Sequence, residues 1–350
     1  MAKMLMEGNE AVAEAALRAG CTHYFGYPIT PQTELSEYLA REMPKRKECF
    51  FMQAESEIAA INMVLGASAA GARTMTSSSG PGISLKQEGI SYIAACNLPC
   101  VIVNMARGGP GLGNIAPSQA DYFQAVKGGG HGDYRLIVLA PNSVQELADL
   151  TVEAFDLADK YRNPVMVLGD GLLGQMMESV EFKKSSKNNL AKKTWAARGA
   201  KGRKPNIINS LFLNPKDLEQ VNLKLQEKYK EIEKKEKRCE LYKMEDAEFA
   251  FVAFGIMSRI AKSAVNEARA KGIKAGLIRP ITLWPFPSEK IESASKKVKA
   301  FIVTELNAGQ MVEDVRLAVC GKKPVHFIGR LGGMLLTPQQ LLEKLREVAK

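Results

Sequence analysis

Short apolar runs that alternate with helical patterns constrain the fold of this chain more than any other feature. Runs over residues 98–105, 136–140 and 164–168 have the length and composition of buried parallel strands. Helical patterns over residues 56–71, 82–96 and 143–160 precede or separate them. This alternation predicts an α/β unit over residues 1–180, with a parallel sheet and helices on both faces.

The start of the chain follows the same rhythm. Apolar residues recur at helical spacing over residues 8–19, and residues 23–27 have the pattern of a short strand. A turn then leads into a helix that begins near Gln32. We expect Thr30 to be the N-cap of this helix and Pro31 its first residue, because proline is favoured at that position.

The second half begins with a break in the pattern. Residues 181–214 are basic and polar, which predicts an extended linker, and Asn214-Pro215 should open a long amphipathic helix. A second α/β unit starts at residue 249, with strands predicted over 274–278, 300–304 and 325–328. The chain therefore divides into a first unit (1–180), a linker and long helix (181–245) and a second unit (246–350).

The net charge of +10 is local rather than general. Residues 183–204 hold nine lysines and arginines and no acid, and without them the net charge falls to about +1. A nucleic-acid-binding face would spread its cations over a folded surface with aromatic residues among them, but Trp195 is the only aromatic in this segment. We expect no nucleic-acid partner. Binding of an anionic protein partner through this segment stays open as an alternative function.

The six cysteines, at 21, 49, 96, 100, 239 and 320, include no Cys-x-x-Cys pair. This spacing argues against an iron–sulfur or zinc site and favours reduced thiols. The sequence also lacks the apolar run of about 18 residues that a membrane span needs, and its start lacks a signal-peptide core. We therefore expect a cytoplasmic protein without a membrane partner.

Four loops could carry chemistry, because each follows a predicted strand or opens a helix. They span residues 26–33, 53–58, 77–82 and 106–113. Ligands of open parallel sheets bind at the carboxyl ends of strands, where these loops lie.

Each candidate side chain in these loops also has a structural explanation. Glu57 could be an ordinary acid at a helix N-terminus, and Ser79-Gly80 an ordinary strand–helix turn. Arg107 could grip a carboxylate bidentately or could be a surface residue beside a flexible loop.

Three of these loops, together with a segment of the second unit, contain motifs that resemble those of a known family. Residues 27–31 (YPITP), 53–57 (QAESE), 104–107 (NMAR) and 279–287 (RPITLWPFP) resemble motifs of the α-type subunit of 2-oxoacid:ferredoxin oxidoreductases. The resemblance covers about residues 1–180 and 245–350. It implies a thiamine-diphosphate pyrimidine-binding domain followed by a transketolase-C-terminal-like α/β domain.

The resemblance also implies residue roles. Glu57 would be the catalytic acid–base group that contacts the cofactor pyrimidine, and Thr30 and Arg107 would bind the substrate. Cofactor contacts would come from Thr30 and Glu57 and from four further residues: Pro28, Ile29, Ser79 and Gly80. The implied reaction is the coenzyme A-dependent oxidative decarboxylation of a 2-oxoacid, with electrons passed to ferredoxin.

Parts of such an enzyme are missing from this sequence. Gly169-Asp170-Gly171 and Asn188-Asn189 imitate the diphosphate signature of thiamine enzymes, but their separation is about ten residues too short. We therefore expect no metal ligand in this chain. A β subunit would bind the diphosphate and Mg²⁺, and γ and δ (ferredoxin-like) subunits would complete an assembly, a dimer of heteromers, whose partner subunits hold [4Fe–4S] clusters.

Two questions stay open at this point. The length and separate-subunit layout favour a branched-chain 2-oxoacid, with 2-oxoglutarate second and pyruvate third. His131 follows a glycine run and could contact substrate or coenzyme A, or could be a solvated loop residue.

Overall fold

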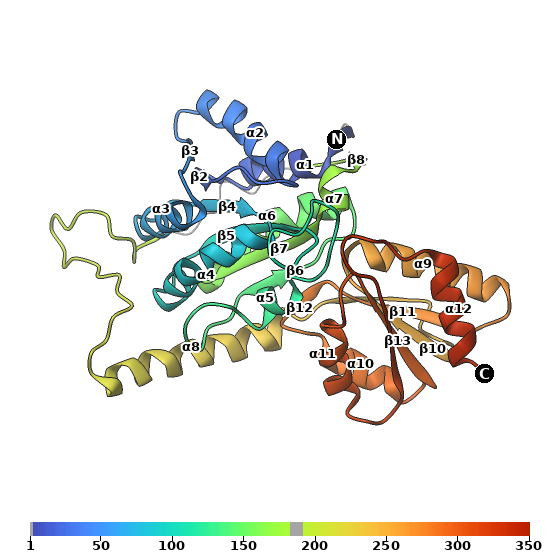
Figure 1. Cartoon of the computed structure of the whole chain (residues 1–350). Coiled ribbons are helices and arrows are strands. Elements are labelled where there is room, and N and C mark those ends of the chain that lie inside the picture. The colour runs from blue at the N-terminus through green and yellow to red at the C-terminus, as the bar shows by residue number, and fades with distance from the viewer. Residues whose placement is uncertain (1–2, 183–191) are drawn as a thin grey trace.

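The computed structural model describes residues 3–182 and 192–350, which form two α/β bodies connected by a long helix (Figure 1). The first body, blue to green in Figure 1, contains the N-terminus. The second, orange to red, contains the C-terminus. One continuous hydrophobic core runs through both bodies.

The first body is built on a seven-stranded sheet with the order β12-β6-β7-β5-β4-β2-β3. Every neighbouring pair is parallel except β12–β6. The strands are β2 (His23–Gly26), β3 (Phe50–Gln53), β4 (Thr74–Ser78), β5 (Cys100–Ala106), β6 (Ile137–Leu139), β7 (Pro164–Asp170) and β12 (Thr282–Trp284). All seven residues of β5 are buried, as expected of a central strand covered on both faces.

Helices cover both faces of this sheet. They are α1 (Gly8–Arg18), α2 (Thr33–Glu42), the short η1 (Met43–Lys45), α3 (Glu57–Ala69), α4 (Gly80–Ala95), α5 (Tyr122–Val126), α6 (Val144–Tyr161) and α7 (Gly171–Gln175). Helix α3 packs on α4, whereas α1 packs on α2 and α6. A separate ribbon of β1 (Met4–Glu7) and β8 (Met177–Val180) is antiparallel. The predicted α/β class and parallel sheet are confirmed.

The predicted N-cap and first residue of α2 were each two residues too early. The helix begins at Thr33 with Gln32 as its N-cap, so Thr30 does not cap it and Pro31 precedes it. The reason is that the Gln32 side chain, fully buried, bonds to Ser77 in the neighbouring strand β4. This contact fixes the turn before the helix can start.

The second body contains a five-stranded sheet with the order β14-β13-β10-β11-β9. Its strands are β9 (Cys239–Tyr242), β10 (Phe249–Val252), β11 (Ala275–Pro280), β13 (Ala300–Glu305) and β14 (Val325–Gly329). Only β9 is antiparallel to its neighbour. The helices are α9 (Gly255–Ala270), α10 (Ser288–Ser295), α11 (Met311–Val319) and α12 (Pro338–Val348).

The connection between the bodies is less free than an extended linker. Trp195 stacks under the Arg162 guanidinium, and Arg198 donates to the carbonyls of Ala70 and Gly71, so residues 192–198 lie against the first body. The chain then leaves as a loop, yellow at the left of Figure 1, and enters α8 (Pro215–Lys235). The predicted Asn214 cap and Pro215 start of this helix are confirmed.

Two features lock the bodies together. The 279–287 motif, which the sequence placed in the second unit, sends β12 back into the first sheet beside β6. Arg279, almost fully buried, pairs bidentately with Glu146 of α6 (2.7 and 2.8 Å) and with Glu240 of β9 (2.9 Å).

Candidate functional site

The loops singled out from the sequence meet at one edge of the first sheet. Strands β5, β4, β2 and β3 are adjacent and parallel, so their carboxyl ends lie side by side. The loop after β2 carries Thr30, the loop after β3 leads to Glu57, β4 leads to Ser79, and β5 leads to Arg107. This is the edge at which open α/β sheets bind ligands.

Glu57 is the first residue of α3 and is 6% exposed. Ser56 caps the helix by accepting a hydrogen bond from the Ala59 amide, and this fixes where the helix starts. A Cβ atom at position 82 would lie 2.6 Å from Glu57 Oε1 and would overlap Ser78 Oγ. Gly82 is therefore the residue that lets helix α4 approach the carboxylate and the serine hydroxyl.

The structure brings Arg107 and Thr30 together. Arg107 donates to the Thr30 carbonyl (2.8 Å) and to the Leu112 carbonyl (3.0 Å). Thr30 is exposed, whereas Arg107 is half-buried. These contacts hold the guanidinium between the loops after β2 and β5. Arg107 and Thr30, both expected to bind substrate, are therefore in direct contact at the sheet edge.

A second carboxyl group, Asp121, was not found from the sequence. It accepts a hydrogen bond from Asn104 of β5 (2.9 Å) and lies over the first residue of α4, Gly80. Burial raises the pKa of Asp121, while the Asn104 hydrogen bond and the charge of Arg107 act in the opposite direction. Its signal in the sequence is weak, because it sits in a loop fifteen residues beyond β5.

Several buried polar atoms at this edge have no hydrogen-bond partner among the described residues. They include the hydroxyls of Ser78 and Ser79 and the Oδ1 atom of Asn104. Burying such groups without a partner is costly, so a polar ligand that bonds to them is favoured. Together with the buried Glu57 carboxylate, these groups can bond to a polar ligand that carries nitrogen donors and acceptors.

Pro28 and Ile29 lie in the loop after β2, at the same edge as Glu57. Pro28 is exposed and Ile29 half-buried, so both can contact a ligand that reaches this edge.

The second body shapes the Arg107 loop, which the sequence did not reveal. Asn114 donates to the Gly332 carbonyl, and Gly333 approaches Ala116 closely. Gln119 bonds to Phe254 and Leu306 at the ends of β10 and β13. The loop after β5 is thus held from both sides.

His131 lies elsewhere. It lines a cavity of about 180 Å³ with Tyr92 and Leu218, next to the last turns of α4. Gly82, beside Glu57, is in the first turn of the same helix, roughly 15 Å away at 1.5 Å per residue. The structure therefore does not bring His131 to Glu57.

The Asp170 carboxylate caps the N-termini of two helices, α7 and α9. It is buried at the end of β7 and accepts hydrogen bonds from the amides of Leu172 and Leu173, which begin α7, and of Ile256 in α9. Burial raises its pKa to about 6.

Asn188 and Asn189, the other half of the imitated signature, lie outside the described residues. Within residues 3–182 and 192–350, no cluster of three or more His, Cys, Asp or Glu could hold a metal ion.

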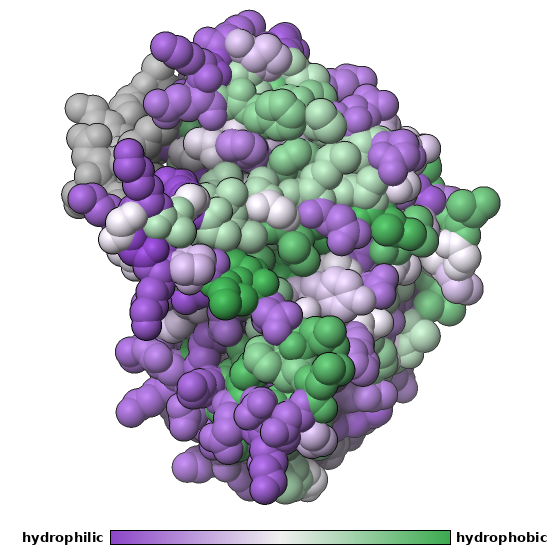
Figure 2. Space-filling view, turned by 90° about the vertical axis from the view of Figure 1, so that its left-hand side faces the viewer, coloured by the Kyte–Doolittle hydropathy of each residue, from purple (hydrophilic) through white to green (hydrophobic). Residues whose placement is uncertain are grey.

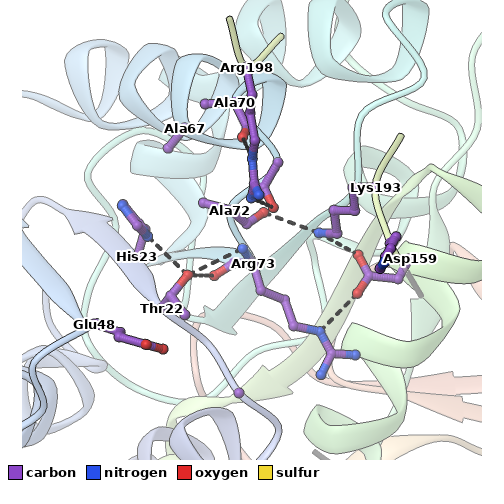
Figure 3. Close-up of a pocket in the computed structure, with 13 residues that line it drawn as sticks. Thr22, His23, Glu48, Ala67, Ala70, Ala72, Arg73, Asp159, Lys193 and Arg198 are labelled. Atoms are coloured by element: carbon purple, nitrogen blue, oxygen red, sulfur yellow. Dashed lines mark hydrogen bonds and ion pairs between the residues drawn. The ribbon is translucent and has the colours of Figure 1, made fainter. Parts of the chain in front are cut away.

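A larger cavity, of about 470 Å³, lies at the opposite, amino edge of the sheet (Figure 3). Arg73 in its wall pairs with Asp156 (2.5 Å) and Asp159 (3.0 Å), and Lys193 pairs with Asp159 (2.8 Å). Its cations are thus largely satisfied inside the protein. These contacts fasten the segment after residue 191 to the first body, and among the described residues that line the cavity no buried side chain lacks a partner.

In the part of the chain that the structure describes, every helix is too short or too polar to cross a membrane.

Fold and edge residues together define an α/β protein with a buried glutamate at the ligand-binding edge of a parallel sheet. Residues 14–244 match the thiamine-diphosphate-binding family of pyruvate flavodoxin/ferredoxin oxidoreductases, and residues 247–341 match core domain II of pyruvate:ferredoxin oxidoreductase. The chain therefore belongs to the 2-oxoacid:ferredoxin oxidoreductase family, and the predicted thiamine-binding and transketolase-like fold is confirmed.

Relatives and solved structures agree with this assignment. The chain is 54% identical to ketoisovalerate oxidoreductase subunit VorB of Methanothermobacter marburgensis, covering 100% of this chain and 99% of the relative. It is 39% identical to 2-oxoglutarate synthase subunit KorA of Methanocaldococcus jannaschii, covering 96% and 97%.

Among solved structures, a 2-oxoglutarate:ferredoxin oxidoreductase from Magnetococcus marinus, with 2-oxoglutarate, coenzyme A and succinyl-CoA bound, superposes with a TM-score of 0.87 at 29% identity. That alignment covers 99% of this chain and 65% of the solved chain. A split-gene transketolase in an inactive β4 tetramer has a TM-score of 0.61 at 16% identity, over 98% of this chain and 97% of the other, and supports the fold alone.

Proposed function

We propose that this chain is the thiamine-binding α-type subunit of a coenzyme A-dependent 2-oxoacid:ferredoxin oxidoreductase acting on the branched-chain 2-oxoacid 2-oxoisovalerate. The products are the acyl-CoA and CO₂, and two electrons pass to ferredoxin. The observation that carries the proposal is the buried Glu57 carboxylate, with Gly82 and Ser78 around it, at the same sheet edge as Arg107 and Thr30.

Glu57 is the acid–base group in this proposal. Its burial beneath α4 excludes water from the carboxylate, which lies at the N-terminus of α3. It would bond to a ring nitrogen of the cofactor pyrimidine, with Ser79 and Gly80 contacting the cofactor from the same sheet edge. When bound, thiamine diphosphate supplies the carbon nucleophile and electron sink that decarboxylation of a 2-oxoacid requires.

Arg107 and Thr30 orient the substrate. A guanidinium already anchored by the carbonyls of Thr30 and Leu112 has N–H groups left to receive a carboxylate or keto oxygen. The Thr30 hydroxyl, exposed at the same place, can donate to the keto oxygen. Pro28 and Ile29 would contact the cofactor from the same loop.

The preference for a branched-chain substrate rests on the 54% identity to a ketoisovalerate oxidoreductase subunit, against 39% to a 2-oxoglutarate synthase subunit. 2-Oxoglutarate is the second candidate and pyruvate the third.

Partner subunits complete the proposed enzyme. We assign the diphosphate and Mg²⁺ to a β subunit and [4Fe–4S] clusters to partners that include γ and δ subunits, in a dimer of heteromers. Cysteines in the reduced form are compatible with the cytoplasmic location that we propose.

The β subunit has a suitable docking face beside Glu57. Helix α3 has no charged residue after Glu57, yet Ile58 is 49% exposed, and Leu85 of the adjacent α4 is 51% exposed. Figure 2, which views the molecule from the side of α3, shows hydrophobic residues spread across the middle of this face with hydrophilic residues around them. Such a patch is typical of a protein–protein contact.

We also propose the domain limits drawn from the sequence, with a pyrimidine-binding domain to residue 180 and a transketolase-like domain from residue 246. The segment between them ends in β9, which extends the second sheet.

The alternative function, binding of an anionic partner through the basic segment, has less support. Lys193 and Arg198 are engaged with Asp159 and with backbone carbonyls of the first body. Of the other cations in this segment, Lys192, Lys201, Arg203 and Lys204 are exposed, and the lysines at 183, 184 and 187 lie outside the described residues.

The proposal is tested by purifying the chain anaerobically with the subunits that accompany it and measuring viologen dye reduction. The assay contains thiamine diphosphate, Mg²⁺ and coenzyme A, with 2-oxoisovalerate, 2-oxoglutarate and pyruvate in parallel. We expect coenzyme A-dependent reduction, fastest with 2-oxoisovalerate. A faster reaction with another acid would overturn the substrate assignment, and no reduction by an intact, iron-containing complex would overturn the function.

A further inference from the structure

Lys86 is a fully buried lysine beside the proposed site, and none of the steps above uses it. Its Nζ atom donates to Thr76 Oγ1 (2.7 Å) and to the Ser77 carbonyl (2.9 Å), both in strand β4. Neither acceptor is charged, and Lys86 forms no ion pair with any residue of 3–182 or 192–350. A buried ammonium with neutral partners is costly, and burial lowers the pKa of Lys86 to about 7.

Helix periodicity places Lys86 on the face of α4 that is turned toward α3, the helix that begins with Glu57. Gly82, Lys86 and Gly89 are three to four residues apart and share one face of α4. A Cβ atom at Gly82 would lie 2.6 Å from Glu57 Oε1, and one at Gly89 would lie 2.5 Å from Ile61 of α3. Lys86 is therefore on the stripe of α4 that faces α3, one turn behind the contact with the Glu57 carboxylate.

Glu57 is the charge that acts on Lys86. Strand β4 contributes only hydroxyl and carbonyl groups, and Tyr24 of β2 reaches the neighbouring Ser77 hydroxyl as a neutral phenol. Asp121 lies over Gly80, at the start of α4, and is attracted to Arg107 rather than to Lys86. Lys86 therefore lies within range of the Glu57 charge, and both side chains are buried.

We propose that Lys86 is a positioning residue for Glu57, whose amine sets the protonation of the carboxyl group so that the pocket stays electrically neutral. A carboxylate beside an ammonium and a carboxylic acid beside a neutral amine carry the same net charge. The pair can thus hold one proton on either partner without placing a net charge in a dry site. This inference rests on the acid–base role proposed for Glu57.

The first test is the pH profile of kcat/KM for the assembled complex carrying Lys86→Met, which keeps an unbranched side chain one atom shorter and removes its charge. Without the ammonium, the Glu57 carboxylate loses stabilisation, so the acidic limb should move to higher pH by about one unit or more. Lys228→Met is the matched control. Lys228 is also largely buried and bonded to neutral oxygens of Asn97 and Arg162, but it lies on α8.

The second test needs neither cofactor nor activity. In the full chain labelled with ¹³Cε-lysine, the resonance absent from Lys86→Met identifies Lys86. We expect this resonance to titrate near pH 7 in the wild type and at a lower pH in Glu57→Gln, because the charge that favours the ammonium is gone.

The outcomes separate the two proposals. A Lys86→Met profile that overlays the wild type, with only a lower kcat, would show a structural role and overturn the inference. If Lys86→Met does not fold, Lys86 can be assigned by the Glu57→Gln shift, and a spectrum with no shifted lysine overturns the inference. Full activity of Glu57→Gln would remove the acid–base role itself, independently of the lysine titration.

Discussion

At the scale of single residues, the role of Glu57 gives the sharpest prediction. Glu57→Gln removes a titratable proton while keeping nearly the same shape, so 2-oxoacid-dependent dye reduction should fall by about 100-fold or more. Glu55→Gln is the control, because Glu55 is exposed two residues earlier. Thermal unfolding of both variants should match the wild type. Equal activity of both variants would contradict the assignment.

Arg107 should act on substrate binding. Losing a charge-assisted hydrogen bond costs about 1.5–3 kcal/mol, so Arg107→Ala should raise the KM for the 2-oxoacid by roughly 10–100-fold. Arg107→Lys keeps the positive charge but loses the bidentate guanidinium geometry. Its KM should therefore lie between those of the wild type and Arg107→Ala. Steady-state kinetics gives KM, and a thiamine diphosphate titration checks that cofactor affinity changes less. An unchanged KM in Arg107→Ala would reject the role.

Sequence reasoning reached some of these residues and missed others for a physical reason. Glu57, Ser79 and Arg107 directly follow strands or open helices, so the topology rule alone places them at one edge. Lys86 lies about one and a half turns into helix α4, and Asp121 lies far along the loop after β5. At such positions the neighbours of a residue are set by packing and not by chain order. A buried lysine in particular resembles a surface lysine in sequence.

At the scale of elements, α8 provides a prediction with a defined pH dependence. Burial lowers the pKa of Lys228 to about 7 in the folded chain, below its ordinary 10.5. The unfolded chain therefore binds more protons between about pH 7 and 10.5, and the free energy of unfolding rises with pH across this window. Lys228→Met removes this contribution, so the variant should gain stability relative to wild type at pH 7 and lose that gain as the pH rises.

Thermal unfolding of both proteins at pH 6, 7.5 and 9 measures the effect. Other titrating groups cancel in the difference between the two melting temperatures. A difference that is the same at all three values would mean that Lys228 keeps its ordinary ionisation when the chain folds.

Element prediction from the sequence succeeded where local signals are strong and failed where a distant contact decides. Asn214-Pro215 fixes the start of α8 without help from elsewhere. The start of α2 instead depends on the Gln32–Ser77 hydrogen bond, between residues 45 positions apart. Strand β12 was missed because its partner β6 is 143 residues earlier in the chain, as the pairing of Thr282 with Leu139 shows.

At the scale of the whole molecule, α3 presents a surface whose composition makes sense only in an assembly. Gly66 is exposed on this helix, and a Cβ atom there would contact nothing within 4 Å. A glycine in a helix costs about 0.5–1 kcal/mol relative to alanine, and nothing within the described chain requires it. Close approach of a partner backbone would explain why the position has no side chain.

Substitution of Gly66 should therefore change stability and assembly in opposite directions. Gly66→Leu should raise the free energy of unfolding of the isolated chain by about 0.5–1 kcal/mol through helix propensity. The same side chain should block the partner, so the variant should co-purify with less of the other subunits. Gly66→Ala should give a similar gain in stability with a smaller loss of assembly.

Ser263→Leu, at an exposed position of α9 in the second body, controls for adding an apolar side chain to a surface. It should leave co-purification unchanged. Chemical denaturation of the isolated variants and subunit ratios after anaerobic size-exclusion chromatography are the two measurements. If Gly66→Leu is more stable and assembles normally, the α3 face stays free in the complex, and the β subunit must reach the Glu57 edge over the loops that carry Thr30 and Arg107.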